Sequence, residues 1–263
     1  MSNIHPTAII DSKAELADDV EVSPYAIIGA GVKIDSGTWV GPHTVIEGPT
    51  TIGKENRIFQ FASVGAEPQD KKYKKGEQTT LSIGDRNVIR ECVTINRGTS
   101  QDIGKTVIGD DNWIMAYVHI AHDCIVGNNT IFANNTTLAG HVTIHDYAIL
   151  GGFTLVHKFC HVGEYAFTGM GTQLGKDLPP FVMAFGAPGI PRGINNEGLK
   201  RHRFDDGTRA EIKNAYRALY RQDLPLKEAI EKLQEKSSSE PIKQMADFCK
   251  RSLEDASGRG IVR

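Results

Sequence analysis

Histidines are concentrated in one part of this 263-residue chain. Six of the nine lie between residues 119 and 161, namely His119, His122, His141, His145, His157 and His161. A neutral imidazole can remove a proton from a hydroxyl or an amine, and it can also bind zinc. Three interpretations are open from these residues alone: a general base, a zinc site, or surface histidines that pair with one another or with a neighbouring subunit.

A six-residue repeat determines where these histidines lie. Large apolar residues, nearly all aliphatic, recur at every sixth position over residues 4–64, 83–95 and 108–174, and Thr168 is the one polar residue in the series. A period of six fits the two-residue period of a strand and does not fit the period of a helix. The pattern is typical of hexapeptide repeats, which form stacked coils.

Such coils predict a triangular prism of short parallel strands, with the aliphatic residues filling its interior. Residues three hexads apart then lie on one face of successive coils. His122, His141 and His157 belong to hexads related in this way, and none of them occupies an interior position. Because neighbouring strands are about 4.8 Å apart, we expect the three side chains to reach one substrate.

Two segments interrupt the repeat, residues 66–82 and 101–107, and we expect both to leave the prism as loops. The proline-rich segment 177–193 cannot be helical and reads as a cap or linker. Apolar residues at helical spacing beyond it predict three amphipathic helices. The expected domains are therefore a β-prism over residues 1–190 and an α-helical domain over residues 191–263.

Composition restricts the function classes. Net charge is -2 with a pI near 6.5, which argues against a general nucleic-acid or anionic-membrane binder. No apolar run is long enough for a membrane span and the start lacks a secretory signal, so we expect a soluble cytoplasmic protein. Basic residues in segment 71–75 and over 200–221 suggest a phosphorylated substrate or an acidic carrier protein, or a solvated helical face. Without a GxSxG or P-loop motif, direct group transfer is the simpler enzymatic hypothesis.

Several longer segments are specific enough to indicate a family: FQFASVG, IRECVTINRGT, HIAHDCIVGNN, ANNTTLAGHV, LVHKFC and NNEGLKR. Over essentially its whole length the chain resembles the UDP-N-acetylglucosamine O-acyltransferases of lipid A synthesis. The resemblance implies a left-handed parallel β-helix, a homotrimer, and active sites between adjacent subunits. The implied reaction moves a (3R)-hydroxyacyl group from acyl carrier protein to the 3-hydroxyl of UDP-N-acetylglucosamine, without cofactor or metal.

The resemblance also implies residue roles. His122 would be the general base, Asp123 would orient or charge-balance its imidazole, and Gly140 would donate its backbone N–H to the thioester oxygen. Successive strand residues point in opposite directions, so Asp123 can reach His122 only if the chain turns there, or else its partner belongs to a neighbouring subunit. The implied substrate contacts are Gln69, Asp70, Lys72, His119, His141, His157, Asn195, Glu197 and Arg201.

Four positions depart from the family pattern: Asn96, Lys158, His202 and Met170. Met170 stands where long-chain members have glycine, at the end of the acyl groove. A methionine there would shorten the groove, and each methylene that cannot be buried costs the donor about 0.8 kcal/mol. We therefore expect Met170 to act as an acyl-chain ruler that favours about ten carbons over fourteen.

Other hexapeptide-repeat proteins remain as alternatives. The N-acyltransferase of the same pathway carries an additional N-terminal domain, which we do not expect here because the repeat begins at Ile4. A zinc-dependent carbonic anhydrase and a non-catalytic scaffold use the same prism. Metal content would distinguish the carbonic anhydrase, and saturable nucleotide binding would exclude the scaffold.

Overall fold

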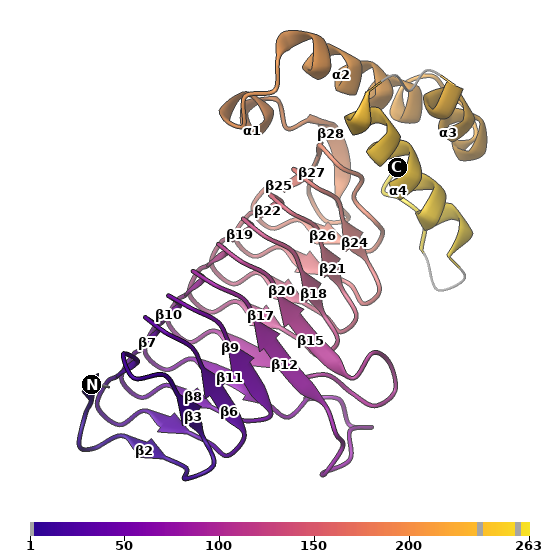
Figure 1. Ribbon diagram of the computed structural model, residues 1–263. Coiled ribbons are helices and arrows are strands. Elements are labelled where there is room, and N and C mark those ends of the chain that lie inside the picture. Colours follow the sequence, from indigo (N-terminus) through magenta and orange to yellow (C-terminus); the bar gives the residue numbers. More distant parts are fainter. Residues whose placement is uncertain (1–2, 236–238, 256–258) are drawn as a thin grey trace.

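The hexapeptide repeat folds into a left-handed parallel β-helix, as expected, with helices at its C-terminal end (Figure 1). The computed structural model describes residues 3–235, 239–255 and 259–263. Residues 236–238 and 256–258 of the predicted helical domain lie outside these. Each coil of the prism contributes one short strand to each of three sheets.

The sheets form the three sides of the prism within the described residues. Sheet 1 contains β1 (Asn3–Ile4), β4 (Glu21–Val22), β7 (Trp39–Val40), β10 (Arg57–Ile58), β13 (Val88–Ile89), β16 (Trp113–Ile114), β19 (Ile131–Phe132), β22 (Ile149–Leu150), β25 (Phe167–Thr168), β27 (Val182–Phe185) and β28 (Ile190–Ile194). Sheet 2 contains β2 (Ile9–Ile10), β5 (Ile27–Ile28), β8 (Val45–Ile46), β11 (Ser63–Ala66), β14 (Thr94–Asn96), β17 (His119–Ile120), β20 (Thr137–Leu138), β23 (Leu155–Val156) and β26 (Gln173–Leu174). Sheet 3 contains β3 (Glu15–Leu16), β6 (Val32–Ile34), β9 (Thr50–Ile52), β12 (Thr80–Ile83), β15 (Lys105–Ile108), β18 (Ile125–Val126), β21 (Thr143–Ile144) and β24 (His161–Val162).

The core of the prism is built from the first and fifth residues of the hexads. Ile114 and Leu138, at the first position, and Val118 and Val142, at the fifth, have no exposed surface. Burying one such side chain contributes about 1.5–3 kcal/mol, so the regular spacing supplies most of the stability of each coil. The polar Thr168 is accommodated inside because its hydroxyl bonds to that of Thr154 at 2.8 Å.

Each coil turns where the fourth hexad residue adopts a left-handed backbone conformation. The φ angles are 57° at Asp123, 64° at His141 and 64° at Phe159. These three residues follow β17, β20 and β23, at the corner between sheet 2 and sheet 3. The turn therefore redirects the side chains of consecutive residues, which a strand would send to opposite sides.

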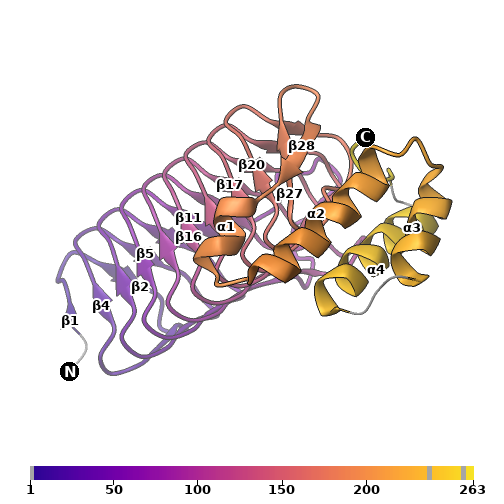
Figure 2. The same cartoon turned by 90° about the horizontal axis from the view of Figure 1, so that it is seen from above.

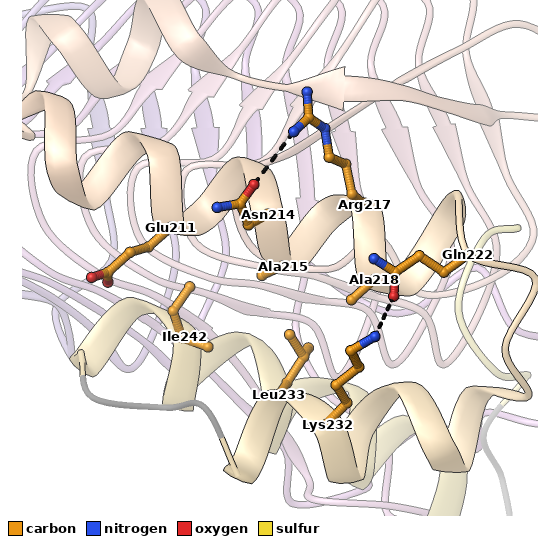
Figure 3. Close-up of a pocket in the computed structure, with 9 residues that line it drawn as sticks. All are labelled: Glu211, Asn214, Ala215, Arg217, Ala218, Gln222, Lys232, Leu233 and Ile242. Carbon is orange, nitrogen blue, oxygen red and sulfur yellow. Dashed lines mark hydrogen bonds between the residues drawn. The ribbon is translucent and has the colours of Figure 1, made fainter.

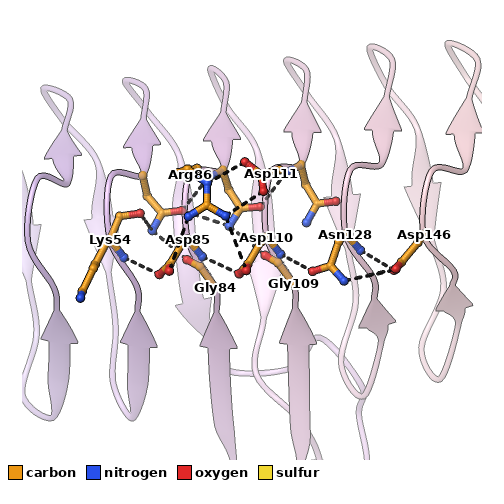
Figure 4. A network of polar contacts seen from close by, with 12 residues as sticks. Lys54, Gly84, Asp85, Arg86, Gly109, Asp110, Asp111, Asn128 and Asp146 are labelled. Carbon is orange, nitrogen blue, oxygen red and sulfur yellow. Dashed lines mark hydrogen bonds and ion pairs between the residues drawn. The ribbon is translucent and has the colours of Figure 1, made fainter. Parts of the chain in front are cut away.

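The corner between sheet 3 and sheet 1 carries a ladder of side-chain to backbone hydrogen bonds (Figure 4). Asp85 accepts from the backbone N–H of Lys54 at 2.7 Å, and Asp110 accepts from that of Asp85 at 2.8 Å. Asn128 continues the ladder to Asp110 at 2.8 Å, and Asp146 continues it to Asn128 at 2.7 Å. Each acceptor thus ties its own coil to the coil before it.

Asparagines at the same corner form a second ladder that runs in the opposite direction. Asn56 accepts from the backbone N–H of Asn87 at 2.9 Å, and Asn87 accepts from that of Asn112 at 2.9 Å. Asn112 then accepts from the backbone N–H of Thr130 at 2.8 Å. This corner is consequently held to the coil on either side.

Both interruptions of the repeat leave the prism at the corner between sheets 2 and 3. The segment between β11 and β12 covers residues 67–79, and the segment between β14 and β15 covers residues 97–104. The predicted loops 66–82 and 101–107 therefore include strand residues. The reason is that β12 and β15 pair along four residues, beginning before the interior residues Ile83 and Ile108.

The described part of the C-terminal domain holds four helices rather than the three expected: α1 (Asn196–Arg201), α2 (Asp206–Tyr220), α3 (Leu226–Glu235) and α4 (Glu240–Glu254). The sequence did not indicate α1, because its six residues contain one large apolar side chain, Leu199. The proline-rich segment is a cap in which β28 pairs antiparallel to β27. Figures 1 and 2 place the helices over the end of the prism at which these strands lie. In the described residues no helix is both long and apolar enough to cross a membrane.

Candidate active site

His122 and Asp123 form a hydrogen-bonded pair in the turn after β17. The Nδ1 atom of His122 lies 2.8 Å from Oδ2 of Asp123. The left-handed conformation of Asp123 brings the two side chains together, which confirms the first of the two arrangements considered from the sequence. Because Nδ1 is engaged, Nε2 is the histidine nitrogen left for another molecule.

A buried environment fixes Asp123. Its carboxylate accepts the backbone N–H of Thr99 at 3.1 and 3.0 Å and the Thr99 hydroxyl at 2.6 Å. Burial alone would raise the pKa of Asp123, but the hydrogen bonds from His122 and Thr99 outweigh it and hold the pKa below 3.8. The carboxylate is therefore ionised at neutral pH and acts as an acceptor.

His141 lies one coil further along and contacts the same pair. Its ring is perpendicular to that of His122, with centroids 4.9 Å apart, and it is stacked on Phe159 at 4.4 Å. The Nδ1 atom of His141 lies 2.5 Å from Oδ2 of Asp102 and 4.0 Å from Oδ2 of Asp123. Two histidines and two carboxylates thus meet at one corner of the prism.

A pocket of about 470 Å³ opens over these residues. It brings together the candidate general base His122 and five other residues whose roles the family resemblance implies: Asp70, Lys72, Gly140, His141 and His157. Its lining consists of Asp70, Lys72, Gln101, Asp102, His122, Ala139, Gly140, His141, His157, Lys158 and Phe159. The expected convergence of His122, His141 and His157 on one face is confirmed.

Gly140 lies against the imidazole of His122, three hexads away in sequence. A Cβ atom at residue 140 would lie 2.5 Å from Cε1 and 2.7 Å from Nε2 of His122, so the ring has its present place only because residue 140 is glycine. Among the described residues, none accepts a hydrogen bond from the Gly140 N–H. That N–H is therefore a donor available beside Nε2 of the histidine.

The same side chains have the spacing of a metal site. In the part of the chain that the structure describes, one group of ligand atoms from His122, Asp123 and His141 lies within 4.8 Å of one another. Two imidazoles and a carboxylate form a donor set that suits zinc. The geometry is also that of a histidine base held by a carboxylate, so the distances alone do not choose between these chemistries.

Comparisons with known proteins decide the family. Residues 177–262 match the family described as "Udp N-acetylglucosamine O-acyltransferase; Domain 2", and residues 105–140 match "Bacterial transferase hexapeptide (six repeats)". The acyl-[acyl-carrier-protein]–UDP-N-acetylglucosamine O-acyltransferase of Janthinobacterium sp. (strain Marseille) is 55% identical, with 100% of both chains covered. The chain belongs to the UDP-N-acetylglucosamine O-acyltransferase family.

Solved structures agree with this assignment. The UDP-N-acetylglucosamine acyltransferase of Francisella novicida superposes with a TM-score of 0.95 at 42% identity, covering 99% of this chain and 94% of that one. The Acinetobacter baumannii protein LpxA gives a TM-score of 0.95 at 44% identity, covering 99% of this chain and 100% of that one. The resemblance inferred from the sequence segments is thereby confirmed.

Two predicted substrate contacts of this family member lie near the pocket but do not line it. His119, in β17, is half-buried, and its Nδ1 is 2.7 Å from the Thr94 hydroxyl. Burial, with a smaller contribution from His122, lowers the pKa of His119 and keeps it neutral. Gln69 is exposed in the segment that carries Asp70 and Lys72.

The remaining predicted substrate contacts lie in α1 or at its N-cap. Asn195 caps α1 by accepting from the Gly198 N–H at 3.0 Å, and it also donates to the Tyr165 carbonyl at 2.9 Å. Glu197 pairs with Lys200 within the helix, where Arg201 is the last residue. Together with Met170, in the turn after β25, these residues stay outside the pocket lining of the same chain.

Sequence reasoning missed three residues that organise the site. Thr99 and Asp102 contact Asp123 and His141, and Arg97 holds the segment 67–79. The buried Arg97 guanidinium donates to the Gly65 carbonyl at 2.9 Å and reaches Glu67 and Tyr73 at 3.2 Å each. The interruption of the repeat at residues 101–107 indicated a loop close to these residues, but it did not indicate which side chains the loop would contact.

Two other histidines of the cluster support packing instead. His145 and His161 lie below α4 with ring centroids 6.0 Å apart, and Phe248 packs on His145 at 5.9 Å. Burial, aided by the charge of Arg251, lowers the pKa of both, to about 4 for His161. These imidazoles are neutral at physiological pH.

A second cavity, of about 420 Å³, lies among α2, α3 and α4 (Figure 3). Two of the charged residues that line it are already hydrogen-bonded: Arg217 donates to Asn214 at 3.4 Å, and Lys232 donates to Gln222 at 2.6 Å. The described residues that line it include no histidine or cysteine. The pocket over the histidines is therefore the stronger candidate for chemistry.

Proposed function

We propose that this chain transfers a (3R)-hydroxyacyl group from acyl carrier protein to the 3-hydroxyl of UDP-N-acetylglucosamine, the first step of lipid A biosynthesis. The proposal is supported by the acyltransferase names of full-length relatives at 55% identity. The observation that carries the mechanism is the His122–Asp123 pair beside the free Gly140 N–H. We also propose a cytoplasmic location, as the sequence leads us to expect.

In this mechanism His122 acts as the general base. Asp123 holds Nδ1, so Nε2 removes the proton from the sugar 3-hydroxyl as its oxygen attacks the thioester carbonyl. The Gly140 N–H donates to the oxyanion of the tetrahedral intermediate. Collapse breaks the C–S bond, and protonated His122 returns its proton to the departing thiolate, so base and protons are restored at the end of one turnover.

Charge in the pocket suits the nucleotide. Lys72 and Lys158 line it, and a diphosphate is stabilised by such cationic donors, while His141 and His157 add polar groups for the rest of the substrate. We propose that Asp70 and the exposed Gln69 contribute further polar contacts from the same segment. His119 contributes through its unbonded ring nitrogen.

We further propose that the site is completed by a neighbouring subunit of a homotrimer. Asn195, Glu197 and Arg201 carry polar groups suited to a sugar nucleotide, yet they do not line the pocket of their own chain. A second copy would bring these residues to the pocket. Met170, which is 81% exposed in one chain, would then be covered and would end the acyl groove.

A transfer assay tests these points together. Radiolabelled UDP-N-acetylglucosamine is mixed with hydroxyacyl carrier proteins of ten, twelve and fourteen carbons, and the protein is compared with its His122→Ala variant. We expect product mainly from the ten-carbon donor, and we expect the variant to lose it. Product from the fourteen-carbon donor alone would support the acyl transfer but would refute the proposed role of Met170 as a ruler.

The ruler has its own test in Met170→Gly, which should shift the preference toward longer donors. An unchanged ranking of donors would place the ruler elsewhere. If the folded protein transfers no acyl group, metal analysis is the next measurement. One zinc ion per His122–Asp123–His141 group would then favour the metal interpretation.

A further inference from the structure

The segment 97–104 contributes a carboxylate to a second histidine, separately from the His122–Asp123 pair. Oδ2 of Asp102 lies 2.5 Å from Nδ1 of His141. We propose that Asp102 is a positioning residue that fixes the tautomer and ring orientation of His141 for substrate binding. This inference rests on the proposed function and assigns its site a second histidine–carboxylate pair.

The ring of His141 is restricted on several sides. Phe159 stacks on it with an angle of 11° between the ring planes, and His122 meets it at 88°. These contacts limit its tilt, but they do not decide which ring nitrogen carries the proton. The bond to Asp102 does so, because a carboxylate is an acceptor and selects the tautomer with the proton on Nδ1.

A definite binding role follows for the other nitrogen. In the neutral ring with Nδ1–H bonded to Asp102, Nε2 is an acceptor within the pocket. Its partner must be a donor, and a hydroxyl or amide N–H of the sugar fits this requirement. His122 would then take the reacting proton while His141 orients the same sugar, and Asp102 affects the reaction only through His141.

The short segment suits this task because it is fixed at several points. Arg97 anchors its start to the Gly65 carbonyl, and Thr99 binds Asp123 through both its N–H and its hydroxyl. Asp102 lies three residues after Thr99 and is 39% exposed at its side chain, so it reaches His141 from the solvent side of the pocket. One segment thereby positions both histidines.

A double-mutant cycle tests the proposal. The variants are Asp102→Ala, Asp102→Asn, His141→Ala and the double variant Asp102→Ala/His141→Ala. We expect Asp102→Ala to raise KM for UDP-N-acetylglucosamine about tenfold with kcat changed less than threefold. Asp102→Asn should be milder because its amide oxygen can still accept. In the His141→Ala background, loss of the Asp102 carboxylate should have no further effect.

The control variant is Asp18→Ala, which removes an exposed carboxylate from an N-terminal coil. It should leave both constants unchanged. An equal Asp102→Ala effect with and without His141, or a fall in kcat at constant KM, would overturn the proposal, since neither outcome follows from orientation of His141.

Imidazole nitrogen NMR provides a readout that does not depend on turnover. With ¹⁵N-labelled histidine, Asp102→Ala should shift the His141 signals toward the other tautomer, whereas Asp18→Ala should not. Unchanged signals would refute the positioning role. If the shift occurs but neither the protein nor any variant transfers an acyl group, the proposed function fails while the histidine–carboxylate pair stands.

Discussion

Replacing Gly140 by alanine is a direct test of the position of His122. Gly140 has an ordinary backbone conformation, so alanine adds one methyl group without backbone strain. That methyl group would point at the imidazole, with Cβ only 2.5 Å from Cε1 of His122. The substitution therefore acts on the proposed base through contact alone.

The size of the effect follows from the distances. Ordinary van der Waals contact begins at 3.4 Å, so the imidazole must retreat by about 1 Å. A retreat of this size disturbs both the 2.8 Å bond to Asp123 and the alignment of Nε2 with the sugar hydroxyl. Misplacement of a catalytic group by about 1 Å can cost about 10² in rate, and we expect kcat to fall by that factor.

The assay compares Gly140→Ala with Gly175→Ala, using the acyl donor that the unaltered protein prefers. Gly175 is exposed, and a Cβ there would have no heavy atom within 4 Å, so its variant should keep full activity. Urea unfolding should give similar midpoints for the two variants. A Gly140→Ala protein that is stably folded and retains kcat within threefold would refute the proposed place of His122 in the reaction.

Two further predictions concern protonation. Thr99→Val removes the hydroxyl that helps keep the pKa of Asp123 low, so carboxylate NMR titration should show Asp123 taking up its proton at higher pH, whereas Thr99→Ser should restore the lower pKa. An Asp123 titration that is unchanged in Thr99→Val would contradict this role. Burial, with the nearby charge of Arg251, lowers the pKa of His161 from 6.5 to about 4, so the unfolded chain takes up a proton that the folded chain excludes. The contribution of His161 to the free energy of unfolding should therefore be fully present above pH 6.5. It should fall by about 1–2 kcal/mol, after allowance for solvent access, as the pH falls toward 4. Urea unfolding between pH 7.5 and 4.5 should show this decline reduced in His161→Gln, although Asp177, whose pKa is raised by burial, acts in the opposite direction in both proteins. An equal decline in both would assign the pH dependence to other groups.

The regular part of this protein could be predicted from its sequence because the repeat fixes geometry. Hexads that are three repeats apart must lie above one another on successive coils, and for that reason His122 and His141, whose hexads begin at Ile120 and Leu138, could be placed on one face beforehand. The turn that joins His122 to Asp123 was left as one of two possibilities. It depends on the left-handed backbone angle at the fourth hexad residue, here Asp123, and the spacing of the apolar residues alone does not show which hexad position carries that angle.

The irregular parts could not be predicted in the same way. The path of segment 97–104 has no periodicity, so nothing in the sequence indicated that Thr99 would meet Asp123 or that Asp102 would meet His141. Helix α1 was missed because six residues are too few for a periodic signal. Its Asn195 also has a capping role that a motif match alone does not reveal.

The two hydrogen-bond ladders bear on where such a prism can acquire new segments during evolution. At the corner between sheets 3 and 1, Asp85 binds the coil before it while Asn87 binds the coil after it, so an insertion there would break contacts in both directions. The corner between sheets 2 and 3 lies outside these ladders, and both interruptions of the repeat emerge from it. One corner conserves the length and register of the stack, which leaves the other free to accept the segments that shape a pocket.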